Sequence, residues 1–264
     1  MGATERMKIN STKAALQRGE VVIGPTISHF NCRGIGKIMA AAGFDFVLID
    51  MQHSSFGSES ICDLILQLRE ADVTPIVRIP IEAKTIMGQA MDAGAQSIMV
   101  PDVDKPEIIR ETVKTVLYPP LGERSIGGKT VSSDFATDID IYELRRSSND
   151  QYLGVFQIEG EAAINNLDEL LAQPGLDVAE IGPWDLSQSL GIPGDFKNPR
   201  FLECVDLVIE KCVEHGKYPG IFAGTPELGR FWIERGMKML FFSTDVDIFI
   251  NGSLRALDIL RNRK

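Results

Sequence analysis

The sequence predicts a single domain over residues 1–264, folded as a (β/α)8 TIM barrel. Eight short apolar, β-branched runs recur along the chain with helix-like segments between them, which is the pattern of parallel βα units rather than hairpins. The chain has 264 residues and is 44% hydrophobic, and one barrel of roughly 250 residues uses that length well. Eight such units favour closure into a barrel over an open sheet.

The runs that predict strands are Val21–Gly24, Phe46–Ile49, Pro75–Arg78, Ser97–Val100, Leu153–Ile158, Val178–Ile181, Pro219–Phe222 and Met239–Phe242. Apolar residues spaced three and four apart predict helices between several of these strands. The helical segments are Ser60–Ala71, Pro106–Leu117, Asn165–Ala172, Phe201–His215 and Pro226–Arg235.

Two further segments stand out. Residues 118–152 form a long connection between the fourth and fifth units, and connections of that length in compact domains are usually functional or packed on a partner subunit. The final helix, about Asp245 to Arg263, carries apolar residues as a docking helix should.

Composition excludes several classes of protein. The chain has 27 basic and 37 acidic residues, a net charge of −10, and no cluster of Lys and Arg that would bind a phosphate backbone. The start of the chain is polar, and no apolar run approaches the ~18 residues of a membrane span. We therefore expect a cytoplasmic protein with no nucleic-acid or membrane partner. The cysteines lack metal-binding spacing and are expected to be reduced packing residues; they are Cys32, Cys62, Cys204 and Cys212.

Polar residues follow four of the predicted strands, and in such barrels the reacting groups lie at the C-terminal strand ends. The four stretches are Asp50-Met51-Gln52-His53, Val77-Arg78, Gln157-Ile158-Glu159 and Gly182-Pro183-Trp184-Asp185. Their side chains should converge on one pocket. Two carboxylates from adjacent strand ends, Glu159 and Asp185, suit a hard cation such as Mg²⁺, Mn²⁺ or Co²⁺.

Such a cation can chelate the carboxylate and keto oxygens of a 2-oxo acid and stabilise its enolate as a Lewis acid. Arg78 can donate to the enolate oxygen, and His53 suits proton transfer near neutral pH. Each residue also has a structural interpretation, with Asp185 as a helix cap, Arg78 as an ion-pair partner and His53 as a satisfied histidine. Convergence on one barrel rim favours the catalytic interpretation.

Other residues carry weaker signals. His29 follows the first strand and is a candidate for the pocket wall, whereas His215 at a helix end needs only a dipole contact. Lys217 and Lys238 precede the seventh and eighth strands, at the wrong end of the barrel, and no lysine lies in a predicted strand or at its exit. An enzyme that forms a Schiff base needs such a lysine.

Several stretches, taken together and in this order, resemble the class II pyruvate aldolases of the HpcH/HpaI group, which includes 4-hydroxy-2-oxoheptanedioate aldolase and 2-dehydro-3-deoxyglucarate aldolase. The stretches are Asp50-Met-Gln-His53, Val77-Arg78, Asp92-Ala-Gly-Ala-Gln96, Tyr118-Pro-Pro-Leu-Gly-Glu-Arg124, Gln157-Ile-Glu159 and Gly182-Pro-Trp-Asp-Leu-Ser187. The resemblance runs from about Gly24 to the C-terminus and implies a barrel of the phosphoenolpyruvate/pyruvate superfamily type. It implies reversible cleavage of 4-hydroxy-2-oxo acids to pyruvate, or a related 2-oxo acid, and an aldehyde, with a divalent metal ion and no organic cofactor.

The resemblance also implies residue roles. Glu159 and Asp185 would bind the metal, and Arg78 would steady the enolate. His53 would be the acid–base residue, oriented by Asp92. The substrate carboxylate would be bound by backbone N–H groups at a helix start, and the site would be supported from beside the metal and the histidine. Gly182, Pro183 and Trp184 form the helix start that would bind the carboxylate. Gln157 and Asp50 are the residues that would support the site.

Two positions depart from the pattern of many members. Gln52 stands where many have Glu, which lowers the negative charge beside the histidine. Trp184 stands where many have a small residue, which would narrow the pocket mouth. Members assemble as hexamers or related oligomers such as trimers of dimers, exchanging C-terminal helices and completing sites with a neighbour's loop. Such assembly would account for the 118–152 connection and the apolar last helix.

Two alternatives remain open. The same metal-enolate site could serve a CoA-thioester lyase of the malyl or citryl type, or an oxaloacetate decarboxylase, although this acidic chain offers few basic residues for the CoA phosphates. The chain could instead be a non-catalytic barrel that binds a 2-oxo acid without turnover.

Overall fold

The computed structural model of the protein describes residues 8–138 and 140–261 and confirms the closed (β/α)8 barrel. Neighbouring strands pair in parallel and in chain order, and β8 closes the barrel against β1. The strands are β1 (Val22–Ile27), β2 (Phe46–Asp50), β3 (Thr74–Arg78), β4 (Ser97–Val100), β5 (Leu153–Ile158), β6 (Val178–Ile181), β7 (Tyr218–Ala223) and β8 (Met239–Thr244). Each overlaps its predicted run, and β4, β5 and β6 have the predicted bounds. The polar start of the chain, residues 1–7, lies outside the described residues.

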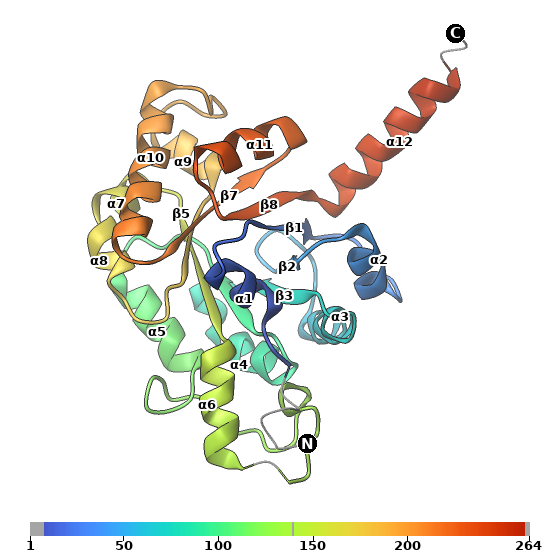
Figure 1. Cartoon of the computed structure of the whole chain (residues 1–264), viewed down its shortest axis with the longest axis vertical. Coiled ribbons are helices and arrows are strands. Elements are labelled where there is room, and N and C mark those ends of the chain that lie inside the picture. The colour runs from blue at the N-terminus through green and yellow to red at the C-terminus, as the bar shows by residue number, and fades with distance from the viewer. Residues whose placement is uncertain (1–7, 139, 262–264) are drawn as a thin grey trace.

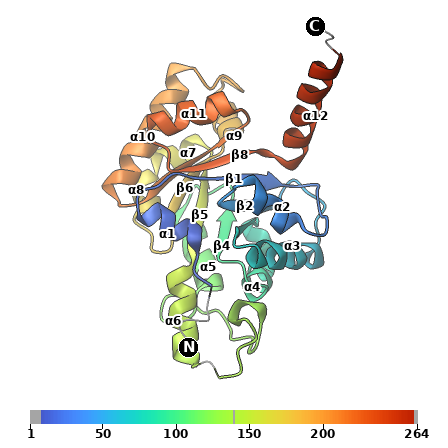
Figure 2. The ribbon, with the colours of Figure 1, turned by 45° about the vertical axis from the view of Figure 1, so that its right-hand side comes forward.

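Helices surround the barrel (Figures 1 and 2). They are α1 (Ser11–Gln17), α2 (Ile35–Ala42), α3 (Ser58–Glu70), α4 (Lys84–Asp92), α5 (Pro106–Val116), α6 (Ile141–Gln151), α7 (Glu161–Asn165), α8 (Leu167–Leu171), α9 (Pro183–Ser189), α10 (Pro199–Glu214), α11 (Pro226–Arg235) and α12 (Asp245–Arg261), with 3-10 turns η2 (Ile81–Ala83) and η3 (Val131–Ser133). The single helix predicted at Asn165–Ala172 is instead the pair α7 and α8, which meet at Asn166.

The barrel interior is filled at the end where the strands begin. Leu16 of α1 is 1% exposed and belongs to the same buried cluster as Val22, Phe46 and Met239, which are the first residues of β1, β2 and β8. A side chain at Gly24 would collide with the backbone and ring of Phe46, so the glycine makes room for the phenylalanine. Because α1 and these side chains close one end, space for a ligand exists at the other end, where the strands stop.

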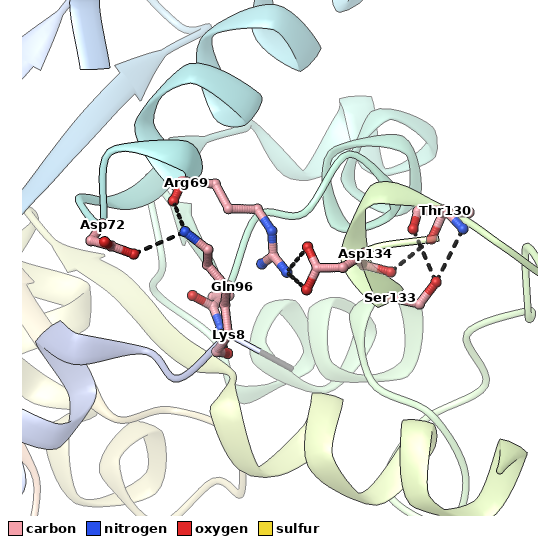
Figure 3. Close-up of polar contacts among 8 residues, drawn as sticks. Lys8, Arg69, Asp72, Gln96, Thr130, Ser133 and Asp134 are labelled. Carbon is pink, nitrogen blue, oxygen red and sulfur yellow. Dashed lines mark hydrogen bonds and ion pairs between the residues drawn. The ribbon is translucent and has the colours of Figure 1, made fainter. Parts of the chain in front are cut away.

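The long connection between β4 and β5, described at 118–138 and 140–152, packs on the barrel wall. Its second half is α6, and its first half is tied to the barrel wall through η3, as Figure 3 shows. The guanidinium of Arg69, whose side chain is 3% exposed, donates from one nitrogen to both carboxylate oxygens of Asp134 at 3.0 Å. Removing Asp134 would leave the buried charge of Arg69 uncompensated, so this pair holds the connection against α3.

The helix α12 extends away from the barrel in both views (Figures 1 and 2). Asp245 at its start is buried, whereas its large apolar side chains are exposed. These are Phe249, Ile250, Leu254, Leu257, Ile259 and Leu260, between 39% and 73% exposed. The expectation of a docked helix is therefore not met within one chain. None of the described helices is long and apolar enough to cross a membrane.

The cysteines are free thiols, as expected. Cys212 is buried and Cys62 and Cys204 are partly buried, which fits a packing role. Cys32 is exposed, so the expectation that it is a packing residue is wrong.

Candidate active site

A cavity of about 830 Å³ opens at the C-terminal end of the barrel. Nine of the residues that the sequence singled out line it, and they come from the ends of β2, β3, β5 and β6. They are Asp50, His53, Arg78, Gln157, Glu159, Gly182, Pro183, Trp184 and Asp185. His29 lines it as well. The predicted convergence of these strand ends on one pocket is therefore what the fold produces, and Asp92 and Gln52 are the two predicted residues that do not take part.

Asp50 and Arg78 form a bidentate ion pair across β2 and β3. Arg78 donates from Nε to Oδ1 of Asp50 at 2.8 Å and from Nη2 to Oδ2 at 2.7 Å. Burial alone would raise the pKa of Asp50, but the hydrogen bonds and charge of Arg78 outweigh it and hold that pKa below its usual value. The remaining terminal nitrogen, Nη1, lies 3.4 Å from Oε1 of Gln157. Arg78 is thus an ion-pair partner and a cavity cation at once.

Glu159 follows β5 at the cavity floor and is 8% exposed. Its Oε1 accepts a hydrogen bond from the backbone N–H of Asp102 at 2.7 Å. A Cβ at Gly182 would collide with the other carboxylate oxygen, so glycine at this position is what lets Glu159 lie against the start of α9. Burial, followed by the negative charges of Glu180, Asp102 and Asp185, raises the pKa of Glu159 to about 8.

Asp185 lies in the first turn of α9, two residues after Pro183. The N-cap of this helix is Gly182, so Asp185 does not have the capping role that was its structural alternative. Its carboxylate accepts no hydrogen bond from any described residue and lines the cavity. An acid at this place is free to bind a ligand.

The donor set of the cavity fits a divalent cation with open positions. Oxygen ligands are those that hard cations prefer, and Glu159 and Asp185 supply them from neighbouring elements. Within residues 8–138 and 140–261, no group of three or more His, Cys, Asp or Glu is arranged to hold a metal. Arg78 is already paired with Asp50, and among the described residues no Lys or Arg forms an ion pair with Glu159 or Asp185, so the negative charges around Glu159 raise its pKa.

Glu180 is a cavity residue that the sequence argument missed. It projects from the middle of β6 in register with Gln157, is 2% exposed, and its Oε2 has no hydrogen-bond partner among the described residues. Burial raises its pKa to about 7, although Gln157 and Arg78 lower it. The available signal was an acidic residue within an otherwise apolar strand, Val178-Ala179-Glu180-Ile181, because inward positions of a barrel strand alternate.

Asp92 lies at the last residue of α4, and its Oδ1 accepts a hydrogen bond from Nη2 of Arg124 at 2.6 Å. Barrel helices run back toward the end where strands begin, so Asp92 lies at the opposite end of the wall from His53, which follows β2. Within one chain Asp92 therefore cannot orient His53. Gln52 contributes only its backbone, whose N–H donates to Oδ1 of Asp50 at 2.9 Å.

Trp184 lies at the cavity mouth, as its departure from the expected pattern suggested. Its side chain lines the cavity, remains 60% exposed, and meets the ring of Phe196 edge-on with centroids 5.0 Å apart. A Cβ at Gly194 would be 3.3 Å from the Trp184 ring, so the loop after α9 passes close beneath the indole.

The chain is similar in sequence and in fold to known aldolases. The chain is 32% identical to a hydroxypyruvate/pyruvate aldolase of Roseobacter denitrificans over 92% of this chain and 94% of the relative. It is 31% identical to a 2-keto-3-deoxy-L-rhamnonate aldolase of Escherichia coli, over 97% of this chain and 94% of the relative. The crystal structure of an HpcH/HpaI aldolase from Desulfitobacterium hafniense matches with a TM-score of 0.89 and 31% identity, covering 96% of this chain and 97% of that one.

Residues 33–251 match the family model described as HpcH/HpaI aldolase/citrate lyase. The matched region runs from α2 into α12 and includes the predicted site residues. The chain belongs to the HpcH/HpaI aldolase/citrate lyase family, and it is a carbon–carbon lyase.

Proposed function

We propose that the protein is a divalent-metal-dependent class II aldolase. It cleaves 4-hydroxy-2-oxo acids reversibly to pyruvate, or a related 2-oxo acid, and an aldehyde, with Mg²⁺, Mn²⁺ or Co²⁺ as its cation. The observation that carries the proposal is the meeting of two carboxylates without cationic partners, Glu159 and Asp185, with the fixed cation Arg78 in one cavity. The relatives named as aldolases support it.

The carboxylates of Glu159 and Asp185 would hold the metal, which would supply a Lewis acid for the charge that develops on an enolate oxygen. Gln157 and Glu180 form the floor beside it. Glu159 rests against Gly182, which keeps the carboxylate at the start of α9. There the helix start at Gly182, Pro183 and Trp184 would bind the carboxylate of the 2-oxo acid through backbone N–H groups.

Arg78 donates a hydrogen bond to the enolate oxygen from the guanidinium that Asp50 holds in place. Two of its nitrogens are occupied by Asp50, which orients the planar group and leaves Nη1 directed toward Gln157. A charge that is already positioned needs no reorganisation as the reaction proceeds, and it is worth more in a water-poor cavity than in bulk water.

His53 moves the proton at the cavity rim, where an imidazole can act as acid or base near neutral pH. Its partner Asp92 comes from a second copy of the chain, because the two lie at opposite ends of the barrel wall in one copy. The exposed apolar face of α12 supports assembly into a homo-oligomer such as a hexamer, since a contiguous apolar helix face marks an interaction surface.

Schiff-base chemistry is disfavoured because no lysine is among the described residues that line the cavity. The scarcity of basic side chains in the described cavity wall also disfavours the CoA-thioester alternative. The family includes citrate lyases, but the CoA phosphates need cations, and Arg78 is the single Arg or Lys side chain of the described cavity wall. An oxaloacetate decarboxylase and a non-catalytic 2-oxo-acid-binding barrel remain as alternatives for experiment.

The deciding experiment follows exchange of the pyruvate methyl protons in deuterated water by NMR, without any aldehyde. We expect exchange that depends on Mn²⁺ or Mg²⁺ and stops when a chelator is added. The Glu159→Gln variant should lose it, whereas Glu203→Gln, on the outer helix α10, should retain it. No exchange with any of the three cations would leave the non-catalytic barrel as the better description, and a borohydride-trapped lysine adduct would refute the class II mechanism.

A further inference from the structure

The cavity has two chemically different halves. Side chains from β2, β3, β5 and β6 give it a polar floor, described above as the place of the metal and the 2-oxo acid. The opposite half is largely apolar, although Thr225, Thr244 and Asp247 also line it, and it comes from β7, β8, α9, the loop after α9, α11 and α12. It is lined by Trp184, Phe196, Phe222, Leu228, Phe241 and Val246.

Three aromatic rings make this half a continuous wall that extends into the core. Trp184 meets Phe196 at 5.0 Å, and Phe196 meets the fully buried Phe201 at 5.6 Å. Phe201 in turn packs against Trp232, which is 0% exposed. Phe196 is thus anchored from behind, and its position does not depend on a ligand. A rigid, anchored aromatic surface of this kind recognises apolar groups by area and shape.

The apolar half offers an anion no permanently charged partner. Arg78 is the one Arg or Lys among the described lining residues, and Asp50 already engages it through two hydrogen bonds. A carboxylate, Asp247, lies at the apolar side near the start of α12 and interacts with Thr244 at 2.9 Å. A second carboxylate or a phosphate on a substrate would therefore be repelled there rather than neutralised.

From this division we propose that the acceptor is an uncharged aldehyde with an aromatic or similarly bulky apolar group, seated against Trp184 and Phe196. The inference rests on the proposed function, since it assumes that the polar half holds the 2-oxo acid. Carbon–carbon bond formation between the enolate carbon and the aldehyde carbon then places the aldehyde's substituent toward the apolar wall. The product class is a 4-hydroxy-2-oxo acid with an apolar substituent at C4.

The test compares three acceptors with pyruvate and Mn²⁺ as kcat/KM: phenylacetaldehyde, glycolaldehyde and succinic semialdehyde. We expect phenylacetaldehyde to exceed the other two by about tenfold or more, the selectivity that a few apolar contacts supply. If pyruvate exchanges its protons but glycolaldehyde or succinic semialdehyde is used as well as phenylacetaldehyde, the inference is overturned and the proposed function stands. If pyruvate does not exchange at all, both fall.

Variants test whether the aromatic wall of the cavity sets the preference among aldehyde acceptors. Phe196→Ala should lower the ratio of kcat/KM for phenylacetaldehyde to that for glycolaldehyde by at least about fivefold. Phe231→Ala is the matched control, because Phe231 is partly exposed, also packs on Trp232 and is not among the residues that line the cavity. Leu228→Arg, which adds a cation to the wall, should raise the use of succinic semialdehyde relative to phenylacetaldehyde. An unchanged acceptor ratio in both Phe196→Ala and Leu228→Arg would overturn the assignment.

Discussion

Arg78 gives Asp50 two hydrogen bonds, at 2.8 and 2.7 Å, from the neighbouring strand at the mouth of the barrel. The pair is almost enclosed, with side-chain exposures of 15% for Arg78 and 2% for Asp50. Two parallel bonds fix the plane of a guanidinium as well as its position. The catalytic value of Arg78 therefore depends on Asp50, which itself need not touch substrate.

The first prediction concerns this pair. Asp50→Asn keeps the shape of the side chain but leaves the Arg78 charge uncompensated, so the folded state should lose roughly 3 kcal/mol. The rate of metal-dependent pyruvate exchange should fall by about tenfold or more, because Arg78 is no longer held in one plane. Denaturant titration and the NMR exchange assay measure the two effects. Asp247→Asn, which removes a cavity carboxylate outside the pair, is the control and should leave stability nearly unchanged.

The second prediction concerns the pH dependence of the metal-free protein. The pKa of Glu159 is raised from 4.5 to about 8 in the fold, chiefly by burial. At intermediate pH the folded chain holds a proton that the unfolded chain has released, so raising the pH favours unfolding. The stability is fully present below pH 4.5 and declines until about pH 8, and the raised pKa of Glu180 adds to the decline up to about pH 7.

The decline assigned to Glu159 amounts to roughly 4 kcal/mol. Denaturant titrations at several pH values, with a chelator present throughout, measure it. Glu159→Gln cannot ionise and should flatten much of the slope. A metal-free wild type that becomes more stable between pH 5 and pH 8 would contradict the assignment of a raised pKa to this carboxyl.

The third prediction concerns added metal. A cation at about 100 times its Kd stabilises the folded state by about 2.7 kcal/mol, which is roughly 5 °C for a chain of this length. Thermal unfolding at pH 7 with and without Mn²⁺ should show this upward shift, and a chelator should reverse it. Asp185→Asn should reduce the shift, while Asp168→Asn, at an exposed ion pair on α8, should not. An equal shift in both variants would place the ion elsewhere.

The barrel was predictable from the sequence because buried parallel strands are short apolar runs, and the runs at β4, β5 and β6 match the structure residue for residue. Strand ends then fix which polar side chains meet, so Arg78, Glu159 and Asp185 could be brought together without coordinates. The position of strand ends does not identify the ion-pair partner of Arg78. Asp50 is expected beside the histidine, and the register of β2 and β3 also sets it opposite Arg78.

Glu180 and Asp92 show two different limits of the sequence argument. Glu180 does not stand out in the sequence because it lies within an otherwise apolar strand, although alternate residues of that strand face the cavity. The role of Asp92 in orienting His53 rests on resemblance alone, and a sequence motif does not show how far apart two residues lie. The exposed face of α12 is a third case, since an amphipathic pattern predicts that a face is covered but does not say by which chain.

The last prediction addresses Asp92 and His53 together. If Asp92 of one copy acts on His53 of another, the variants His53→Ala and Asp92→Asn should each be nearly inactive as pure proteins. Mixing them in equal amounts under conditions that exchange subunits should restore activity, because about a quarter of all sites then combine an intact His53 with an intact Asp92. Pyruvate exchange by NMR and light scattering follow activity and assembly in the same samples.

A control separates this arrangement from independent defects. A mixture of His53→Ala with Glu159→Gln should stay inactive if His53 and Glu159 act within one cavity, as their shared lining implies, since no mixed site then contains both intact residues. Leu254→Glu, which puts a charge on the exposed face of α12, should weaken assembly and reduce activity together. Full activity of a Leu254→Glu monomer, or no recovery of activity in the first mixture, would show instead that residues of its own chain orient His53.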